Sequence, residues 1–417
     1  MGEDRPSGSV GVRAPASAAV PLRRNRRFQV FWAGAVSSLL GLRIAGLAYP
    51  LLILARTGSP ATAGAFGAVQ TGTMLVLAVP GGAVADRANR RTVLAGALAL
   101  QAAALAGVPI AMALHGLTVA QLMSTAVLLG AGTAFGGPVR MLALRSLVPP
   151  AQLSQALVQE EVRTSGGNLL GTPLGGALYA LGSGLPFVAS AVGCVLAMIS
   201  VLVVRFDGRA TRPARGGRGG LLKGVRVLWA VGPLRSVLFL VAGLGVVNAA
   251  LTLVVLVRLQ HDGASPRVVG MVLAAGALGG VLGALLTRRL HAALAPGRLL
   301  LAVSGCVVIL LPLVAVPWGT GWLMLVLALI ALGQPGLTVM LDILVFRQVD
   351  DAVRGRVIAT TVAAVGVGTP LGNVLAGVLL QFASPAVASA VLAAVLCVPL
   401  VTAGLDSELR SAPWPDG

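Results

Sequence analysis

Long apolar runs alternate along the chain with short clusters of Gly, Pro and Arg. The first run extends from Phe28 to about Ala55. It is longer than the apolar core of a cleaved signal peptide and long enough to cross about 30 Å of hydrocarbon. The pattern predicts twelve membrane-spanning helices, at 28–55, 60–85, 92–114, 117–139, 153–181, 184–204, 235–257, 268–287, 298–316, 321–346, 355–382 and 386–404.

Polar segments divide these helices into two sets of six. The basic string GRATRPARGGRGG lies in the middle segment, followed by an amphipathic stretch around Lys223 and Trp229 that is typical of a membrane-surface segment. We therefore expect a flexible basic cytoplasmic tail, a six-helix bundle, a cytoplasmic basic linker, a second six-helix bundle and a cytoplasmic tail, at 1–27, 28–205, 206–234, 235–404 and 405–417.

Composition supports a membrane protein. The chain is 57% hydrophobic and 11% charged, whereas soluble domains carry about 25% charged residues. Its net charge of +18 would suggest nucleic acid as a partner if the charge covered a soluble surface. A cytoplasmic amino terminus instead places all but four of the 31 Lys and Arg residues in cytoplasmic segments. We predict a multi-pass protein of the cytoplasmic membrane, surrounded by lipid, with both termini cytoplasmic and no nucleic-acid partner.

The two sets of helices share short sequences, which indicates an internal duplication. The pentapeptide GTPLG occurs at residues 171–175 and again at 368–372. A weaker repeat joins GAVADR at 82–87 to GALLTR at 283–288, at nearly the same offset. Two six-helix halves related by an axis along the membrane normal resemble the layout of the major facilitator superfamily, and this resemblance implies a substrate site between the halves near the midplane.

The loop after the second predicted helix carries a specific resemblance. Residues 82–91, GAVADRANRR, resemble the G-x-x-x-D-R-x-G-R-R signature of the major facilitator superfamily, with Asn89 where that pattern has its last glycine. Asn also adopts left-handed turns, so the change is mild. The resemblance implies that the loop latches the cytoplasmic side of a transporter, and the alternative is a basic loop that only sets topology. The signature residues are Gly82, Asp86, Arg87, Arg90 and Arg91.

Within that superfamily the chain is similar to bacterial drug, macrolide and siderophore exporters, through segments such as NRRFQVFWAGAVSSLLG, LVPPAQLSQAL and VDDAVRGRV. Such exporters often carry an acidic residue after the glycine of the first helix. This chain has Leu42 and Arg43 there. The fifth helix partly matches the family's antiporter pattern, with its proline one place late. Glycine spacing of this kind suits close, bendable packing in the fifth and eleventh helices; the residues are Gly167, Gly171, Pro173, Gly175, Gly176, Gly368, Pro370 and Gly372.

Ionisable residues at membrane depth are rare and costly, which draws attention to Arg43. As a functional group it would line a cavity and bind an anion or alternate with a proton; as a structural group it would pair with carbonyls or reach outward. By the family resemblance, helices 1, 4, 7 and 10 line the cavity. Their further candidate residues are Ser37, Ser38, Tyr49, Gln121, Asn248 and Gln334. Each is equally suited to a hydrogen bond with a neighbouring helix.

Arg140 and Asp342 occupy equivalent places in the two halves and form a candidate gate pair, an ion pair made in one conformation and broken in another. Asp342 is equally suited to take a proton or to sit hydrated at the interface. Glu160, Glu161 and Arg163 are expected to form a charged network near the membrane surface.

The sequence lacks the residue patterns that metal binding, ATP binding or enzymatic catalysis would require. The three cysteines and three histidines are scattered, so no metal site is expected. A P-loop needs G-x-x-x-x-G-K-[ST], and the single lysine, Lys223, follows a leucine. No cofactor is expected, and no nucleophile, base and orienting acid assemble to suggest an enzyme.

These observations predict an all-α integral membrane protein with the major facilitator fold. The expected function is secondary active, proton-coupled export of a small hydrophobic or amphiphilic compound by alternating access, carried out by a monomer. The family resemblance supplies the direction of transport. The alternatives are an uptake symporter or facilitator of the same fold, and a membrane receptor or scaffold that transports nothing.

Overall fold

The structure, a computed structural model, describes residues 21–204, 232–337 and 351–405. Regular secondary structure in these ranges is helical throughout, with twelve α-helices and two short 3-10 helices, Leu22–Arg24 and Pro150–Gln152. Each predicted span overlaps one α-helix. The end of the predicted span 321–346, and most of the predicted linker and of both tails, lie outside the described residues. The prediction of an all-α membrane fold is confirmed.

The α-helices of the first half follow the predicted spans closely. They are α1 (Arg26–Thr57), α2 (Pro60–Arg87), α3 (Arg90–Ala113), α4 (Val119–Leu147), α5 (Leu153–Leu181) and α6 (Leu185–Val203). One boundary differs: α4 continues beyond the predicted end at 139, because no residue between Pro138 and Leu147 breaks a helix. Arg140 and Arg145 therefore lie on its last turns and not in a loop.

The second half repeats the order of elements. Its helices are α8 (Gly232–His261), α9 (Pro266–Ala293), α10 (Pro296–Leu313), α11 (Gly319–Leu332), α13 (Asp351–Phe382) and α14 (Pro385–Leu405). Ten helices in the described ranges are long and apolar enough to cross a membrane. The 29-residue α5 is more polar, and it packs against α1 and α9.

The helix ends on one side of the bundle carry the arginines Arg26, Arg90 and Arg145; we call this side the arginine-rich face. On the other side, the opposite face, the chain turns at glycines such as Gly58, whose φ of 62° suits a residue without Cβ. Polar caps begin several helices on either side. Asn25 accepts a hydrogen bond from Phe28 N (3.2 Å) and donates to Leu147 O at the end of α4 (3.3 Å).

Asn89 caps α3 in the signature loop, where its side chain accepts from Arg91 N at 3.0 Å. Its φ of −64° and ψ of 113° are extended, so the left-handed turn considered for this position is not used. An N-cap residue takes extended angles while its side chain satisfies a free N–H of the first turn, which explains why Asn replaces glycine here.

Glycines bring the helices of each half into backbone contact. A Cβ placed on Gly175 would lie 2.9 Å from Ile44 O of α1, and one on Gly372 would meet Val246 O of α8. The repeated pentapeptide thus makes the same kind of contact in both halves: it packs α5 on α1 and α13 on α8. In α2 the close approach to α4 occurs at Gly81, whereas a Cβ on Gly82 would meet open space.

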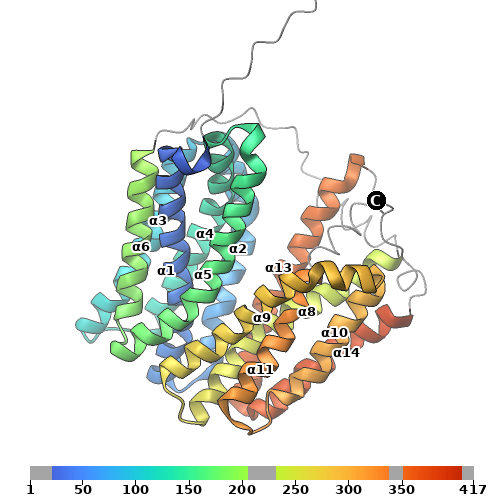
Figure 1. The fold of residues 1–417 in the computed structure, drawn as a ribbon. Coiled ribbons are helices and arrows are strands. Elements are labelled where there is room, and N and C mark those ends of the chain that lie inside the picture. Colours follow the sequence, from blue (N-terminus) through green and yellow to red (C-terminus); the bar gives the residue numbers. More distant parts are fainter. Residues whose placement is uncertain (1–20, 205–231, 338–350, 406–417) are drawn as a thin grey trace, which may run out of the picture.

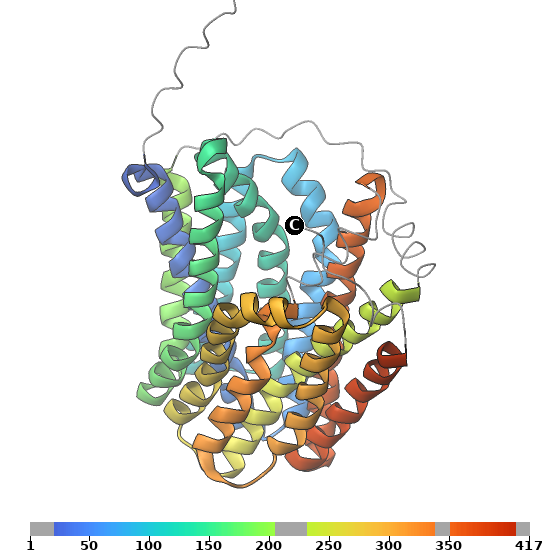
Figure 2. The ribbon, with the colours of Figure 1, turned by 45° about the vertical axis from the view of Figure 1, so that its right-hand side comes forward.

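The two halves meet through a symmetric exchange of helices. The second helix of each half packs on the fifth helix of the other, α2 on α13 and α9 on α5; Figure 2 shows α2 beside α13. These contacts concentrate toward the opposite face, where Gly64 packs on Gly377 and Gly176 on Gly270. Toward the arginine-rich face the ribbons of the two halves diverge (Figure 1).

The seam at the opposite face can be tested by cross-linking. Ser59 Oγ of the α2 cap donates to Gln381 Oε1 of α13 at 2.8 Å; Gln381 is exposed and Ser59 is half-buried. In a background with Cys194, Cys306 and Cys397 replaced by alanine, we expect Ser59→Cys with Gln381→Cys to form a disulfide in membranes under mild oxidation. Each single variant is the control. A double variant that stays reduced would contradict this packing of the halves.

Candidate functional site

A central cavity of about 660 Å³ lies between the two halves. Both halves line it: α1, α2, α4 and α5 from the first, α8 and α9 from the second. Its wall combines apolar and polar side chains, as small-molecule sites do. The polar members are Arg43, Gln70, Thr71, Thr133, Thr172 and Thr252, and the apolar members include Leu39, Leu42, Leu47, Met74 and Leu273.

A smaller hollow of about 220 Å³ continues the cavity toward the opposite face. It shares Gly46, Gln70, Thr71 and Thr252 with the central cavity, and it adds Thr369 and Asn373 of α13. Beyond it, α2 and α13 are in backbone contact at Gly64. The cavity is therefore bounded on that side by the seam between the halves.

Arg43 stands near the middle of the 32-residue α1 and lines the central cavity. Gly171 of α5 packs directly against it, since a Cβ on Gly171 would meet Arg43 Cβ. That contact holds the stem of the side chain between the two helices. Arg43 is exposed, and it lines the central cavity near the middle of α1.

A charged network lies beside the cavity on the side of the arginine-rich face. Glu160 Oε1 and Oε2 accept from Arg163 at 2.6 and 2.8 Å, and Arg140 Nη1 lies 3.0 Å from Glu160 Oε1. Arg163 is buried and also donates to Ala35 O of α1 at 3.2 Å. The network joins α1, α4 and α5, and it gives Arg140 a partner within its own half.

A small hollow of about 160 Å³ connects this network to the cavity. Arg140, Arg163 and Ser38 line it, and it shares Leu39, Leu42 and Thr133 with the central cavity. Gln101, buried in α3, donates to Thr133 Oγ1 across it at 3.2 Å. Arg43, Arg140 and Arg163 therefore line hollows that are connected to one another.

Other predicted cavity residues of the first half occupy packing positions. Tyr49 is buried between the rings of Phe66 and Phe187, with centroids 4.4 and 4.8 Å away. Gln121 donates to Gly107 O of α3 at 3.2 Å. The hydroxyl of Ser37 donates to Ala33 O, one turn back on α1.

The predicted residues of the second half are placed less closely. Asn248 is exposed and lies one helical turn before Thr252, which puts it on the cavity side of α8. Gln334 is half-buried just beyond α11. Asp342 lies outside the described residues, so the pair Arg140 and Asp342 stays a prediction.

The signature loop spreads its charges over different surroundings. Asp86 and Arg87 are exposed, Arg90 is buried, and Arg91 Nε donates to Val201 O of α6 at 3.1 Å. Among the side chains that the structure describes, Asp86 forms no ion pair within 4.0 Å. Arg91 thus links α3 to α6, whereas Asp86 has no charged partner among those side chains.

Sequence reasoning missed several polar cavity residues. Gln70, Thr133 and Thr252 carry no motif. Thr172 and Thr369, however, are the threonines of the two GTPLG pentapeptides, and both line the connected hollows. The duplication itself was the signal that could have identified them.

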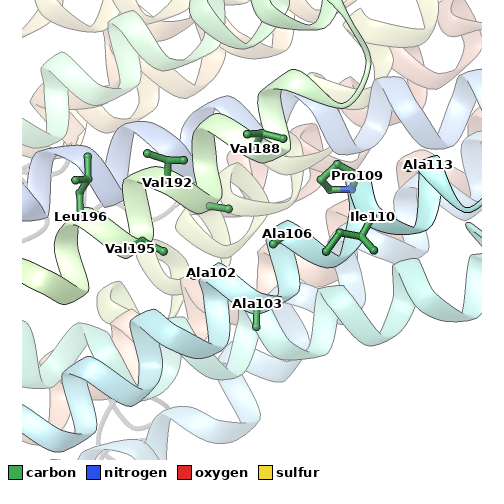
Figure 3. Close-up of a pocket in the computed structure, with 11 residues that line it drawn as sticks. Ala102, Ala103, Ala106, Pro109, Ile110, Ala113, Val188, Val192, Val195 and Leu196 are labelled. Carbon is green, nitrogen blue, oxygen red and sulfur yellow. The ribbon is translucent and has the colours of Figure 1, made fainter.

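A further hollow of about 700 Å³ opens on the outer surface between α3 and α6 (Figure 3). Ala106, Pro109 and Ile110 of α3 face Val192 and Leu196 of α6 across it, and every lining side chain is apolar. Lipid chains fill such a groove in a membrane, and it offers nothing to orient a substrate. The central cavity is therefore the candidate site.

We predict that Glu160→Gln destabilises the protein. It leaves buried Arg163 without its counter-charge, at a cost of about 1–3 kcal/mol in free energy of unfolding. Thermal unfolding in detergent should show a lower Tm. Glu161→Gln is the matched control, because Glu161 is exposed and its carboxylate bonds only to Ser165 Oγ among described residues. Equal Tm values for the two variants would contradict the network.

We predict that Tyr49 acts through packing. Its hydroxyl is buried without a hydrogen-bond partner among the described residues, so Tyr49→Phe should leave both Tm and transport unchanged. Tyr49→Ala should lower the free energy of unfolding by about 3–5 kcal/mol, because a large buried ring is lost. A transport defect in Tyr49→Phe at normal Tm would instead assign the hydroxyl a direct role.

Comparison with known proteins agrees with this architecture. The multidrug efflux pump Tap of Mycobacterium tuberculosis is 27% identical over 395 residues, which cover 89% of this chain and 91% of that protein. The Tap pump of Mycolicibacterium fortuitum is 28% identical over 262 residues, covering 60% of this chain and 64% of that protein.

Solved structures show the same fold at low identity. The nucleoside transporter NupG has a TM-score of 0.72 at 13% identity, and the match covers 90% of this chain and 98% of that one. A bacterial homologue of the iron transporter ferroportin, in its inward-facing state, has a TM-score of 0.72 at 16% identity, covering 93% and 99%. The sequence pattern of the Major Facilitator Superfamily matches residues 31–359. The chain therefore belongs to the Major Facilitator Superfamily of membrane transporters.

Proposed function

We propose that this transporter exports a small hydrophobic or amphiphilic compound from the cytoplasm in exchange for protons. The observation that carries the proposal is the central cavity: it lies between the halves, combines apolar and polar walls, and is bounded by the seam at the opposite face. The likeness to Tap pumps, which are named multidrug efflux pumps, favours export.

The proposed orientation places the arginine-rich face in the cytoplasm, in accordance with the positive-inside rule. In that orientation the described conformation faces inward, ready to load from the cytoplasm. Rocking of one half on the other would then separate α2 from α13 and α9 from α5, opening the cavity to the outside.

The signature loop and the candidate gate pair have proposed roles in the outward-facing state. Asp86, exposed here, would dock when the arginine-rich face closes, and Arg140 would exchange its partner Glu160 for Asp342 of the other half. A proton gradient is the proposed energy source, since the sequence has no P-loop to bind ATP.

The proposal is tested first in cells and then in vesicles. Cells with and without the gene are screened for growth inhibition, and a compound that is less toxic when the chain is present becomes the transport probe. In inverted membrane vesicles with an acidic interior, we expect protein-dependent accumulation of the probe, accompanied by proton release and abolished by an uncoupler.

The disulfide-linked Ser59→Cys, Gln381→Cys variant is the control, because the closed seam prevents outward opening. It should accumulate nothing until it is reduced. Protein-dependent loss of the probe from vesicles would identify an uptake transporter instead. Equal susceptibility of the two strains to every compound would favour a receptor or scaffold.

A further inference from the structure

Arg43 is a cation inside the membrane-spanning region with no described counter-charge. It lines the central cavity about halfway along α1. Among the side chains that the structure describes, in 21–204, 235–287, 289–337 and 366–405, it forms no salt bridge within 4.0 Å and no hydrogen bond. A charge at this depth is costly unless it has a partner or a function.

The neighbouring charges leave an excess of positive charge around the cavity. Arg163 lines the small hollow that adjoins the cavity lined by Arg43. Glu160, the carboxylate beside the cavity, is already shared between Arg140 and Arg163. Glu161 is exposed and bonded to Ser165, and Asp86 and Asp262 lie at helix ends. Among the described side chains, three guanidinium groups thus face or flank connected space, against one carboxylate.

The rest of the cavity wall suits a molecule with one charged end. Hydroxyl and amide groups of Thr71, Thr133 and Gln70 line the same space as Arg43 and offer further hydrogen bonds. Leu39, Leu47, Met74 and other apolar side chains form the remaining surface. The volume of about 660 Å³ is that of a site for a small organic molecule.

We propose that the substrate is an anionic amphiphile, an apolar body with one oxyanion head such as a carboxylate, and that Arg43 binds the head. A guanidinium presents two parallel N–H donors to such a group and stays charged in a membrane. The cavity thereby disfavours cationic amphiphiles of the same size. The inference names the substrate class of the proposed function. That the anion is transported depends on the proposed function, whereas its binding can be measured without transport.

The test compares probes that differ only at the head. Dansyl-aminoundecanoic acid, its methyl ester and the corresponding amine share one apolar body. Dansyl fluorescence on the purified full-length protein gives Kd for each. We expect the carboxylate to bind at least about tenfold more tightly than the ester or the amine, as a charge-assisted hydrogen bond of about 1.5 kcal/mol would give.

Substitutions at Arg43 locate the preference. Arg43→Gln should abolish the preference for the carboxylate while leaving the Kd of the ester unchanged, which also shows that the variant is folded. Arg43→Lys should retain part of the preference, because it keeps the charge. Arg56→Gln is the matched control: it removes one arginine from the same helix at an exposed position outside the cavity, and the preference should persist.

A lipid headgroup and a free compound share this chemistry, and nanodiscs distinguish them. A negatively charged bilayer also repels the carboxylate probe, so the effect of replacing phosphatidylcholine by phosphatidylglycerol is compared in the unaltered protein and in Arg43→Gln. A larger loss of carboxylate binding in the unaltered protein shows that a lipid competes for Arg43; an equal effect in both assigns the site to a free anion. Either result upholds the oxyanion site.

Two outcomes would overturn the inference: equal or tighter binding of the ester or amine, or a carboxylate preference that survives in Arg43→Gln. Failure of the proposed function is a separate result. Carboxylate preference without protein-dependent transport in vesicles would remove export and keep the anion site, and transport of a cationic compound without that preference would do the reverse.

Discussion

Close backbone contact between glycine-bearing helices is the constraint on which this structure depends. In lipid, apolar side chains gain little free energy by moving from acyl chains to another helix. Helices therefore associate where small residues allow dense packing and polar contacts. Gly175 on Ile44 and Gly372 on Val246 fix the fifth helix of each half on the first. Gly64 on Gly377 and Gly176 on Gly270 join the halves. Since these inter-half contacts gather toward one face, space for a cavity remains between the halves.

The fold was largely predictable because lipid imposes simple rules on a sequence. Twelve apolar runs predicted twelve helices, and the repeated GTPLG predicted the duplication that the helix packing displays. The details that failed depend on neighbours that a sequence does not reveal. The end of α4 was placed too early, since a proline and arginines suggested a loop. The close approach of α2 to α4 occurs at Gly81 and not at the signature residue Gly82, because it depends on how α2 is rotated about its axis.

The site was predictable only where a residue was conspicuous by itself. Arg43 stood out as a charge in an apolar run, and it lines the cavity. Tyr49 and Gln121 were equally polar in the sequence, yet one packs among aromatic rings and the other bonds to a neighbouring helix. Helices that are apolar on every side give no periodicity from which to read their inner face. Thr172 lies among glycines whose spacing is explained by helix packing alone, so the motif does not single out the threonine as a cavity residue.

The side chain of Asn25 joins two helices of the first half at the arginine-rich face. Its side-chain oxygen caps α1, and its NH2 group donates to the carbonyl of Leu147 at the end of α4, so it satisfies free backbone groups of both helices. Arg91 ties the start of α3 to the end of α6 in the same layer. These two bonds couple α1 to α4 and α3 to α6, so any movement at the arginine-rich face would carry the helices of each pair together.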